Sequence, residues 1–353
     1  MKHHYYFSII MQDYLRATVS TICERFPRRH VWNDVDLFGC QHWIEAEIAQ
    51  RGLASTRQAF TATYWTDAKG TPASKSVSNI CVELPGTDPQ AGTLIVGAHY
   101  DSRHGMEAQQ SRAPRFDWPH LTNGQPPPTY WDTPGANDNT SSVAALLAML
   151  PALHATPRRH TIHAVFWVNE EYPFYRNFWR KGRRIGDTIF RADGMGSYYH
   201  AERFSKQDRP LIGCIALDTM GCYDDEKGYA SKDAPWLKKA GVNLIFPDSH
   251  NYVAFLSNLA SRSFASRSAA LFRKQCPIPV HVPWIPLGAR ASSGWSDDWS
   301  FWQFGIPAFC VTDTAYIRSP HYHRITDTPE KLNYPVFAKV VEGVLSTIIQ
   351  LTR

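Results

Sequence analysis

Histidine and carboxylate side chains follow several apolar runs of this 353-residue chain. In "LIVGAHYDSRHG", His99 and Asp101 come at the end of one apolar run. Glu170 and Glu171 close a second run, and Asp218 closes a third. Clustered carboxylates raise one another's pKa unless a cation lies among them. Imidazole and carboxylate ligands together suit zinc or a similar divalent ion, whereas magnesium and calcium sites rarely use imidazole.

The adjacent pair Glu170 and Glu171 is informative because neighbouring side chains on an extended segment point in opposite directions. Two consecutive glutamates therefore cannot easily bind the same ion. We expect one to bind a metal while the other reaches a water molecule from a different side. This division between ligand and general base is what metal-assisted hydrolysis requires.

Two further segments carry candidate ligands. "TPGANDNTSSVAALL" places Asp138 in a turn ahead of a helix, where it could equally serve as an N-cap residue. "SPHYHRITDTPEKL" supplies His321 and His323, which would lie in an exposed loop if they had no function. Spacing alone leaves both histidines as candidates.

The pattern of apolar residues predicts the elements that must position these side chains. Helices are expected within 11–53 and at 141–155, 253–264 and 336–351, and strands at 57–65, 76–84, 93–101, 161–171, 211–221 and 306–314. Apolar strands that alternate with helices predict an α/β fold, a three-layer αβα sandwich with a mixed, mainly parallel central sheet. Ligand sites of such sheets lie beyond the carboxyl ends of the strands, where the candidate residues would converge.

We expect one domain over residues 1–353, because the chain shows no convincing linker and no internal repeat. The N-terminal helices would occupy 1–53 and the αβα catalytic core 54–353. Long loops are expected at 103–134 and within 223–298, where the irregular stretches are 223–250 and 276–298. Loops of this length in a compact domain usually form functional walls or lids.

Composition excludes several classes of protein. A net charge of +5 is too small in a chain of this length to imply a nucleic-acid partner. Seven cysteines without a C-x-x-C pair argue against a disulfide framework or a cysteine zinc site. The apolar stretch "YYFSIIM" is too short for a signal peptide, and no later segment predicts a membrane span. We expect a monomer without a membrane partner, cytoplasmic by default.

Over most of residues 90–350 the chain resembles the co-catalytic zinc aminopeptidases, the family that includes the bacterial leucyl aminopeptidases. Glutaminyl cyclases share the fold of that family. The stretches that carry the resemblance, in the family's order, are "AHYDS", "PGANDNTSSVAALL", "NEE", "GMGSYYHAER", "LDTMG", "SDDWSFWQFGIPA" and "PHYHRITDTPEKL". Each motif alone is weak, but the ordered series is specific.

The resemblance implies a role for each matching residue. Five side chains would hold two zinc ions, namely His99 and Asp218 for one ion, Glu171 and His323 for the other, and Asp138 as the bridge. Glu170 would be the general base, and Asp101 would orient His99. His323 is preferred over His321 because the family places its last ligand four residues before the Asp of D-T-x-E-K.

The activity that the resemblance implies is that of a metal-dependent aminopeptidase. It would hydrolyse N-terminal residues from peptides with a free N-terminus, through a water activated by two zinc ions. A single zinc would instead suit a glutaminyl-cyclase-like acyltransferase that cyclises N-terminal Gln. A non-catalytic binding module on the same scaffold is a third interpretation, but such relatives normally lose ligands or the base, and here all six positions are filled.

Two features depart from the family or bear on the substrate. Relatives often have Ser-Asp-His where this chain has Asp298 in the third position, and Asp298 is a candidate partner for a substrate's amino group. Tyr316 is a candidate substrate contact, although tyrosines more often serve packing. The segment 172–193 is longer and more basic than in compact relatives, and its role is open.

Overall fold

The sheet lies at the centre of the molecule in the computed structural model, which describes residues 2–65, 72–104, 132–171, 174, 194–226, 246–285 and 296–353. Nine strands among these residues pair in the order β1-β2-β4-β3-β5-β9-β6-β7, and β8 pairs with β6. Their bounds are β1 Thr56–Trp65, β2 Pro72–Leu84, β3 Thr93–His99, β4 Thr161–Trp167, β5 Leu211–Leu217, β6 Val253–Asn258, β7 Val280–His281, β8 Trp284–Ile285 and β9 Ala308–Thr312.

The four central strands β4, β3, β5 and β9 all run parallel to one another. Antiparallel pairing joins β1 to β2, β2 to β4, and β6 to β9, so the sheet is mixed and mainly parallel. Every residue of β3 and of β4 is buried, as expected for strands covered on both faces. The fold class predicted from the sequence is confirmed.

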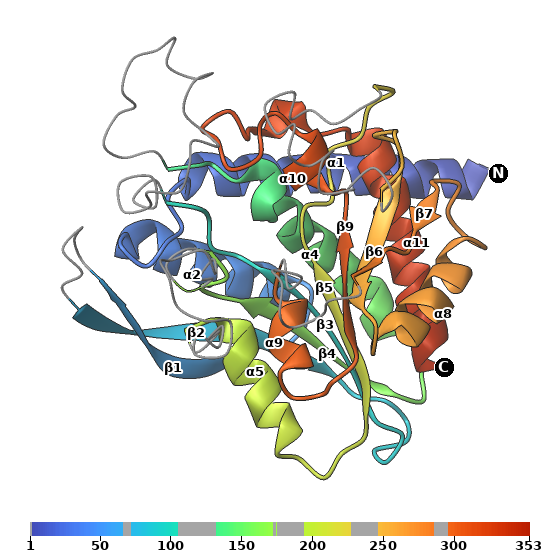
Figure 1. Ribbon diagram of the computed structural model, residues 1–353, viewed down its shortest axis with the longest axis horizontal. Coiled ribbons are helices and arrows are strands. Elements are labelled where there is room, and N and C mark those ends of the chain that lie inside the picture. Colours follow the sequence, from blue (N-terminus) through green and yellow to red (C-terminus); the bar gives the residue numbers. More distant parts are fainter. Residues whose placement is uncertain are drawn as a thin grey trace.

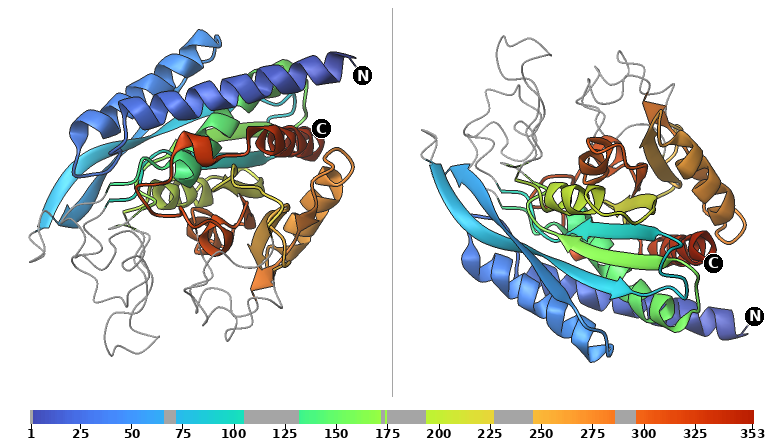
Figure 2. Two further views of the ribbon diagram at one scale, coloured as in Figure 1. Left: turned by 90° about the horizontal axis from the view of Figure 1, so that it is seen from above. Right: turned by 90° about the horizontal axis from the view of Figure 1, so that it is seen from below.

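Helices cover both faces of the sheet (Figures 1 and 2). Their bounds are α1 Lys2–Arg25, α2 Asp34–Gln50, α4 Ser142–Ala155, α5 Gly196–Ser205, α8 Arg262–Phe272, α9 Asp298–Trp302, α10 Ala315–Arg318 and α11 Tyr334–Thr352. One face packs against α1, α2, α4, α8 and α11 in the larger apolar core. The opposite face, through Val165 and Trp167, packs against α5 and α9 in a second apolar core. These are the outer layers of the predicted sandwich.

Most of the predicted elements are present, but their ends differ. The strand predicted at 161–171 ends at Trp167, and the one predicted at 211–221 ends at Leu217. The polar residues that follow each strand therefore lie in loops and are not part of the hydrogen-bonded sheet. The loop residues 105–131, 227–245 and 286–295, together with most of the basic segment 172–193, lie outside the described residues.

The helix predicted at 253–264 is wrong. Residues 253–258 form β6, whose first five residues are buried, and the helix α8 begins only at Arg262. A short apolar run fits a buried strand as well as a helix, and only its pairing with β9 decides between them. Helix α5 was not predicted, and β7 and β8 lie in a stretch expected to be irregular.

Helix α11 is long and apolar enough to cross a membrane by length and composition alone. Its mean hydropathy is 1.3, and 56% of it is buried inside the fold. It packs against α1, α4 and α8. This burial is typical of a helix in a protein core.

Gly97 in β3 lets the Trp167 indole of the neighbouring strand pack on the sheet, since a Cβ at this position would overlap the ring. The glycine is thus required by a side chain of the neighbouring strand rather than by a turn.

We expect Gly97→Ala to lower the free energy of unfolding by about 1–3 kcal/mol, because overpacking forces the indole or the strand to move. Urea unfolding measures the loss. In a Trp167→Phe background, where the smaller ring leaves room, the same substitution should cost less. Equal losses in both backgrounds would show that the indole does not set the requirement for glycine.

Candidate metal centre

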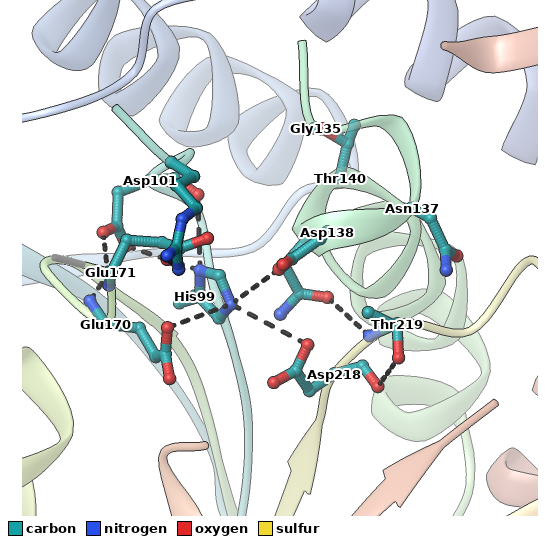
Figure 3. A network of polar contacts seen from close by, with 12 residues as sticks. His99, Asp101, Gly135, Asn137, Asp138, Thr140, Glu170, Glu171, Asp218 and Thr219 are labelled. Carbon is teal, nitrogen blue, oxygen red and sulfur yellow. Dashed lines mark hydrogen bonds and ion pairs between the residues drawn. The ribbon is translucent and has the colours of Figure 1, made fainter. Parts of the chain in front are cut away.

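Five side chains from four loops and one strand end form two donor groups that share one residue. The first group consists of His99, Asp138 and Asp218, and the second of Asp138, Glu171 and His323, with the donor atoms of each group within 4.8 Å of one another. His99 is the last residue of β3, and Asp218 directly follows β5. The carboxyl ends of the parallel strands thus meet where the sequence predicted, and the five proposed ligands converge. Figure 3 shows His99, Asp138, Glu171 and Asp218 of this set.

Asp138 presents one oxygen to each histidine. Its Oδ1 lies 3.4 Å from His99 Nε2, and its Oδ2 lies 3.0 Å from His323 Nε2. His99 Nε2 is also 3.9 Å from Asp218 Oδ1, and His323 Nε2 is 3.5 Å from Glu171 Oε1. His321, by contrast, contacts Thr326 Oγ1 at 3.0 Å and belongs to neither group. The Asp138 carboxylate thus lies between two pairs of donors, His99 with Asp218 and His323 with Glu171.

The donor atoms fit divalent ions. Among the described residues, His99 Nε2, Glu171 Oε1 and Asp218 Oδ1 are buried without a hydrogen-bond partner. Zinc binds His nitrogen and carboxylate oxygen at about 2.0–2.2 Å, so two ligands of a tetrahedral ion lie about 3.3 Å apart. The measured separations of 3.0–3.9 Å bracket this value. Buried polar atoms that face one another without bonding are typical of a site that holds a cation.

Glu170 points to the same space from another side. Its Oε2 lies 3.8 Å from His99 Nε2, and Figure 3 shows Glu170, Asp138 and Asp218 all directed toward His99. The two glutamates were expected on a strand, but they lie beyond the end of β4, after Asn169 with φ 64°. Strand alternation therefore does not account for the different directions of Glu170 and Glu171.

Asp101 holds the two glutamates through their backbone. Its Oδ1 accepts a hydrogen bond from Glu170 N at 3.1 Å, and its Oδ2 accepts one from Glu171 N at 3.0 Å. The His99 Nδ1 atom lies 3.3 Å from the Asp101 carbonyl oxygen and 3.5 Å from its Oδ1. The residue expected to orient His99 therefore contacts His99 and also fixes the segment that carries Glu170 and Glu171.

Asp327 holds the bridging segment in the same way. Its two carboxylate oxygens accept hydrogen bonds from Asn137 N at 2.9 Å and Asp138 N at 3.1 Å. Burial raises the pKa of Asp327 to about 8. The role of this aspartate was not predicted, although its position in D-T-x-E-K was used to choose His323. Asp327 lies in the same motif as the proposed ligand His323, and this position was the signal in the sequence that could have indicated its role.

The asparagines beside Asp138 cross-link strand ends instead of capping a helix. They lie in η1 (Ala136–Ser141), a distorted turn ahead of α4. Asn139 donates from Nδ2 to the Leu217 carbonyl and accepts from Thr219 N, so it fixes the chain on both sides of Asp218. Asn137 accepts from Gly221 N at 2.8 Å. These bonds position Asp138 and Asp218 relative to each other.

The two candidate substrate contacts lie near the centre. Asp298 is the first residue of α9, is buried, and makes no hydrogen bond of normal geometry through its carboxylate among the described residues. Burial, Asp297 and Asp218 raise the pKa of Asp298 well above its ordinary value. Tyr316 lines a small pocket together with Asp218.

The centre is short of positive charge. Burial raises the pKa of Glu170 well above its ordinary value, and repulsion from Glu171 and Asp218 adds to this effect while His99 opposes it. Burial and the Asp138 charge likewise raise the pKa of Asp218. Arg103 Nη1, 3.3 Å from Glu171 Oε2, is a cation that the sequence analysis did not assign to the centre.

This charge balance predicts a pH dependence for protein kept free of divalent ions with a chelator. Because the pKa of Glu170 in the folded protein exceeds its ordinary value of 4.5, folding takes up protons, and the free energy of unfolding should fall as the pH rises above that value. Glu170→Gln removes this contribution and should raise the melting temperature at pH 8 more than at pH 5. The control is Glu24→Gln, an exposed position on α1. An equal effect of both variants at both pH values would contradict the prediction.

Comparisons with known proteins agree with this geometry. Residues 79–348 match the family described as Peptidase family M28. The uncharacterized protein YfbL of Escherichia coli K12 is 31% identical over 255 residues, which are 72% of this chain and 66% of that protein. The alignment thus spans less than two thirds of the relative.

Several solved structures share the fold. A leucine aminopeptidase precursor from Bacteroides thetaiotaomicron superposes with a TM-score of 0.63 at 17% identity, covering 96% of each chain. A Zn-dependent exopeptidase from Parabacteroides distasonis gives 0.62 at 16% identity, covering 96% of this chain and 97% of that one. Fimbriiglobus ruber glutaminyl cyclase gives 0.61 at 17% identity, covering 97% and 95%. The family match includes all five donor residues, and the chain belongs to peptidase family M28.

Proposed function

We propose that this protein is a zinc-dependent aminopeptidase that removes residues from the free N-terminus of peptides. The observation that carries the proposal is the pair of donor groups joined by Asp138, with Glu170 beside them. Membership of a peptidase family, and a fold shared with an exopeptidase and a leucine aminopeptidase precursor, support the same activity.

In this proposal His99, Asp138 and Asp218 would hold one zinc, and Asp138, Glu171 and His323 would hold the other. Zinc would supply a Lewis acid that polarises the scissile carbonyl and lowers the pKa of water. Three ligand carboxylates carry three negative charges, fewer than the four positive charges of two zinc ions, and the remaining positive charge favours ionisation of water.

Glu170 is the proposed general base. It accepts a proton from the attacking water and passes that proton to the leaving amine. Its carboxylate is buried and lies beside His99 without belonging to either donor group, which leaves it available for proton transfer. Asp101 acts as a positioning residue, because its two backbone hydrogen bonds set the directions of Glu170 and Glu171.

Asp298 is the proposed partner of the substrate's ammonium group. A buried carboxylate without a hydrogen-bonded partner gains most from a cation that brings its own charge. Tyr316 is proposed to contact the substrate from the wall that it shares with Asp218. Together they would favour peptides with a free N-terminus.

A substrate panel tests the activity. Zinc-loaded protein should release amino acids from aminoacyl anilides and unblocked peptides, and N-acetylation of the same peptides should abolish release. Glutaminyl cyclases are also among the similar structures. An enzyme of that kind would instead convert Gln-initiated peptides to a cyclised product without releasing an amino acid. That result, with about one zinc at the centre, would overturn the aminopeptidase proposal.

The adjacent glutamates offer a matched pair of variants. Glu170→Gln should retain the zinc content of the wild type and lose about 10²–10⁴-fold in kcat, because the base is removed and the ligands are not. Glu171→Gln should lower the zinc content itself. Metal analysis beside steady-state kinetics separates the two effects. Full activity in Glu170→Gln, or loss of zinc equal to that in Glu171→Gln, would remove Glu170 from its proposed role.

A further inference from the structure

A third donor group lies outside the centre, where His30, His104 and Asp132 converge. We propose that these three residues form a separate binding site for a divalent transition-metal ion such as zinc. His30 precedes the region matched by the family, so the group includes a residue from the N-terminal part of this chain. Neither the zinc proposed for the centre nor the aminopeptidase activity enters the argument for this site.

The distances carry the proposal. His30 Nε2 and His104 Nε2 each lie 3.3 Å from the same oxygen, Asp132 Oδ1. This equals the separation of about 3.3 Å expected between two ligands of a tetrahedral zinc ion. The two imidazole rings are 4.2 Å apart at an angle of 70°, so they meet edge to face rather than stacking. Among the described residues, neither Asp132 Oδ1 nor His30 Nε2 makes a hydrogen bond of normal geometry.

The donor set suits a borderline divalent ion. Two imidazoles and one carboxylate are ligands that zinc accepts, and three protein ligands leave a fourth position for water or another group. Both histidines are buried, with 5% of each exposed. Burial and the neighbouring His30 lower the pKa of His104 to about 4, which favours the neutral imidazole over the charged form.

The local charge does not exclude a cation. Burial raises the pKa of Asp132, but His30, His104 and Arg28 outweigh this effect and the pKa is lowered, so the carboxylate is ionised at neutral pH. The Arg28 side chain is 58% exposed and pairs with Asp36 at 3.6 Å. A divalent ion at this place would therefore meet one carboxylate, that of Asp132, and no unpaired cation from Arg28.

A buried arginine holds the three ligand-bearing segments together. The Arg29 side chain, with the residue only 1% exposed, donates to the carbonyl oxygens of Tyr100 and Pro134, each at 2.9 Å. The backbone of Arg29 exchanges hydrogen bonds with Ser102, whose amide donates to the Arg29 carbonyl at 2.8 Å. Residues within two positions of His30, His104 and Asp132 are thus fixed before any ion binds, which lowers the entropic cost of binding.

The site would adjoin the metal centre through Arg103. This residue precedes His104, its carbonyl accepts from Thr133 N at 3.2 Å, and its Nη1 lies 3.3 Å from Glu171 Oε2. An ion held by His104 and Asp132 would brace the backbone on both sides of that contact. We expect its removal to loosen Arg103 without removing a ligand of the centre.

A fourth donor group, Cys81, His163 and His200, is the competing place for an additional ion. It is less suited to a cation because the positive charge of Arg203 acts on all three residues. Its histidines also pack against Phe204 at 5.0 and 4.8 Å between ring centroids. Its variants serve as controls for the proposed site.

The test is zinc content of the folded full-length protein after equilibration with zinc and removal of unbound ion. Asp132→Asn, an isosteric change, and His30→Gln should each bind one zinc per chain fewer than the wild type. The controls His42→Gln, at an exposed position on α2, and His163→Gln should leave the content unchanged. Circular dichroism confirms that each variant is folded.

The proposal concerns the difference of one ion, so it does not depend on how many ions the centre holds. Cobalt substitution gives a second readout, because the visible absorption of one bound cobalt should be lost in Asp132→Asn. Equal zinc and cobalt content in wild type and Asp132→Asn would overturn the site while leaving the aminopeptidase proposal intact. Loss of one ion in His163→Gln instead would place the additional ion at the competing group and also overturn it.

Discussion

The architecture of the centre follows from one constraint, which is that several carboxylates are buried together with few positive charges. Asp138, Glu170, Glu171 and Asp218 lie around two histidines, and Arg103 Nη1 lies 3.3 Å from both Glu171 Oε2 and His323 Nε2. A buried, charged carboxylate without a compensating partner lowers the free energy of unfolding by several kcal/mol, because it has lost its hydration. The cluster is therefore stable either with bound cations or with protonated acids. Divalent ions held by the two donor groups would neutralise its negative charge.

Backbone amides are the means by which the fold holds this charge in place. Asp101 and Asp327 each accept hydrogen bonds from two successive N–H groups of a ligand-bearing segment. The same edge of the sheet holds the described non-glycine residues with positive φ, which are Asn169, Thr219, Thr314 and His323. Such conformations persist only where surrounding bonds hold them, and they are typical of functional sites. Stability and site geometry thus use the same hydrogen bonds.

The N-terminal helices contribute to this edge although they precede the family match. The connection between α1 and α2 supplies Arg29, whose guanidinium also donates to Thr140 Oγ1 at 2.9 Å, within the segment that carries Asp138. A buried arginine that satisfies several carbonyl oxygens at once is strongly bound and rigid. The helical layer therefore does more than cover the sheet, since it fastens the loops at the strand ends.

The order of apolar strands and helices, and the polar residues at the strand ends, were readable from the sequence because they depend on local periodicity. Strands β3, β4 and β5, helices α1, α2, α4 and α11, and the convergence of His99, Glu170, Glu171 and Asp218 follow from that pattern. The secondary structure of residues 253–264 could not be predicted from the sequence, because a short apolar run fits a strand and a helix equally well. Only the pairing of β6 with β9 decides between them. The positions of Asp327 and His30 beside the candidate ligands could not be predicted from the sequence either. Asp327 bonds Asn137 across 190 positions, and contacts of that kind exist only once the chain has folded.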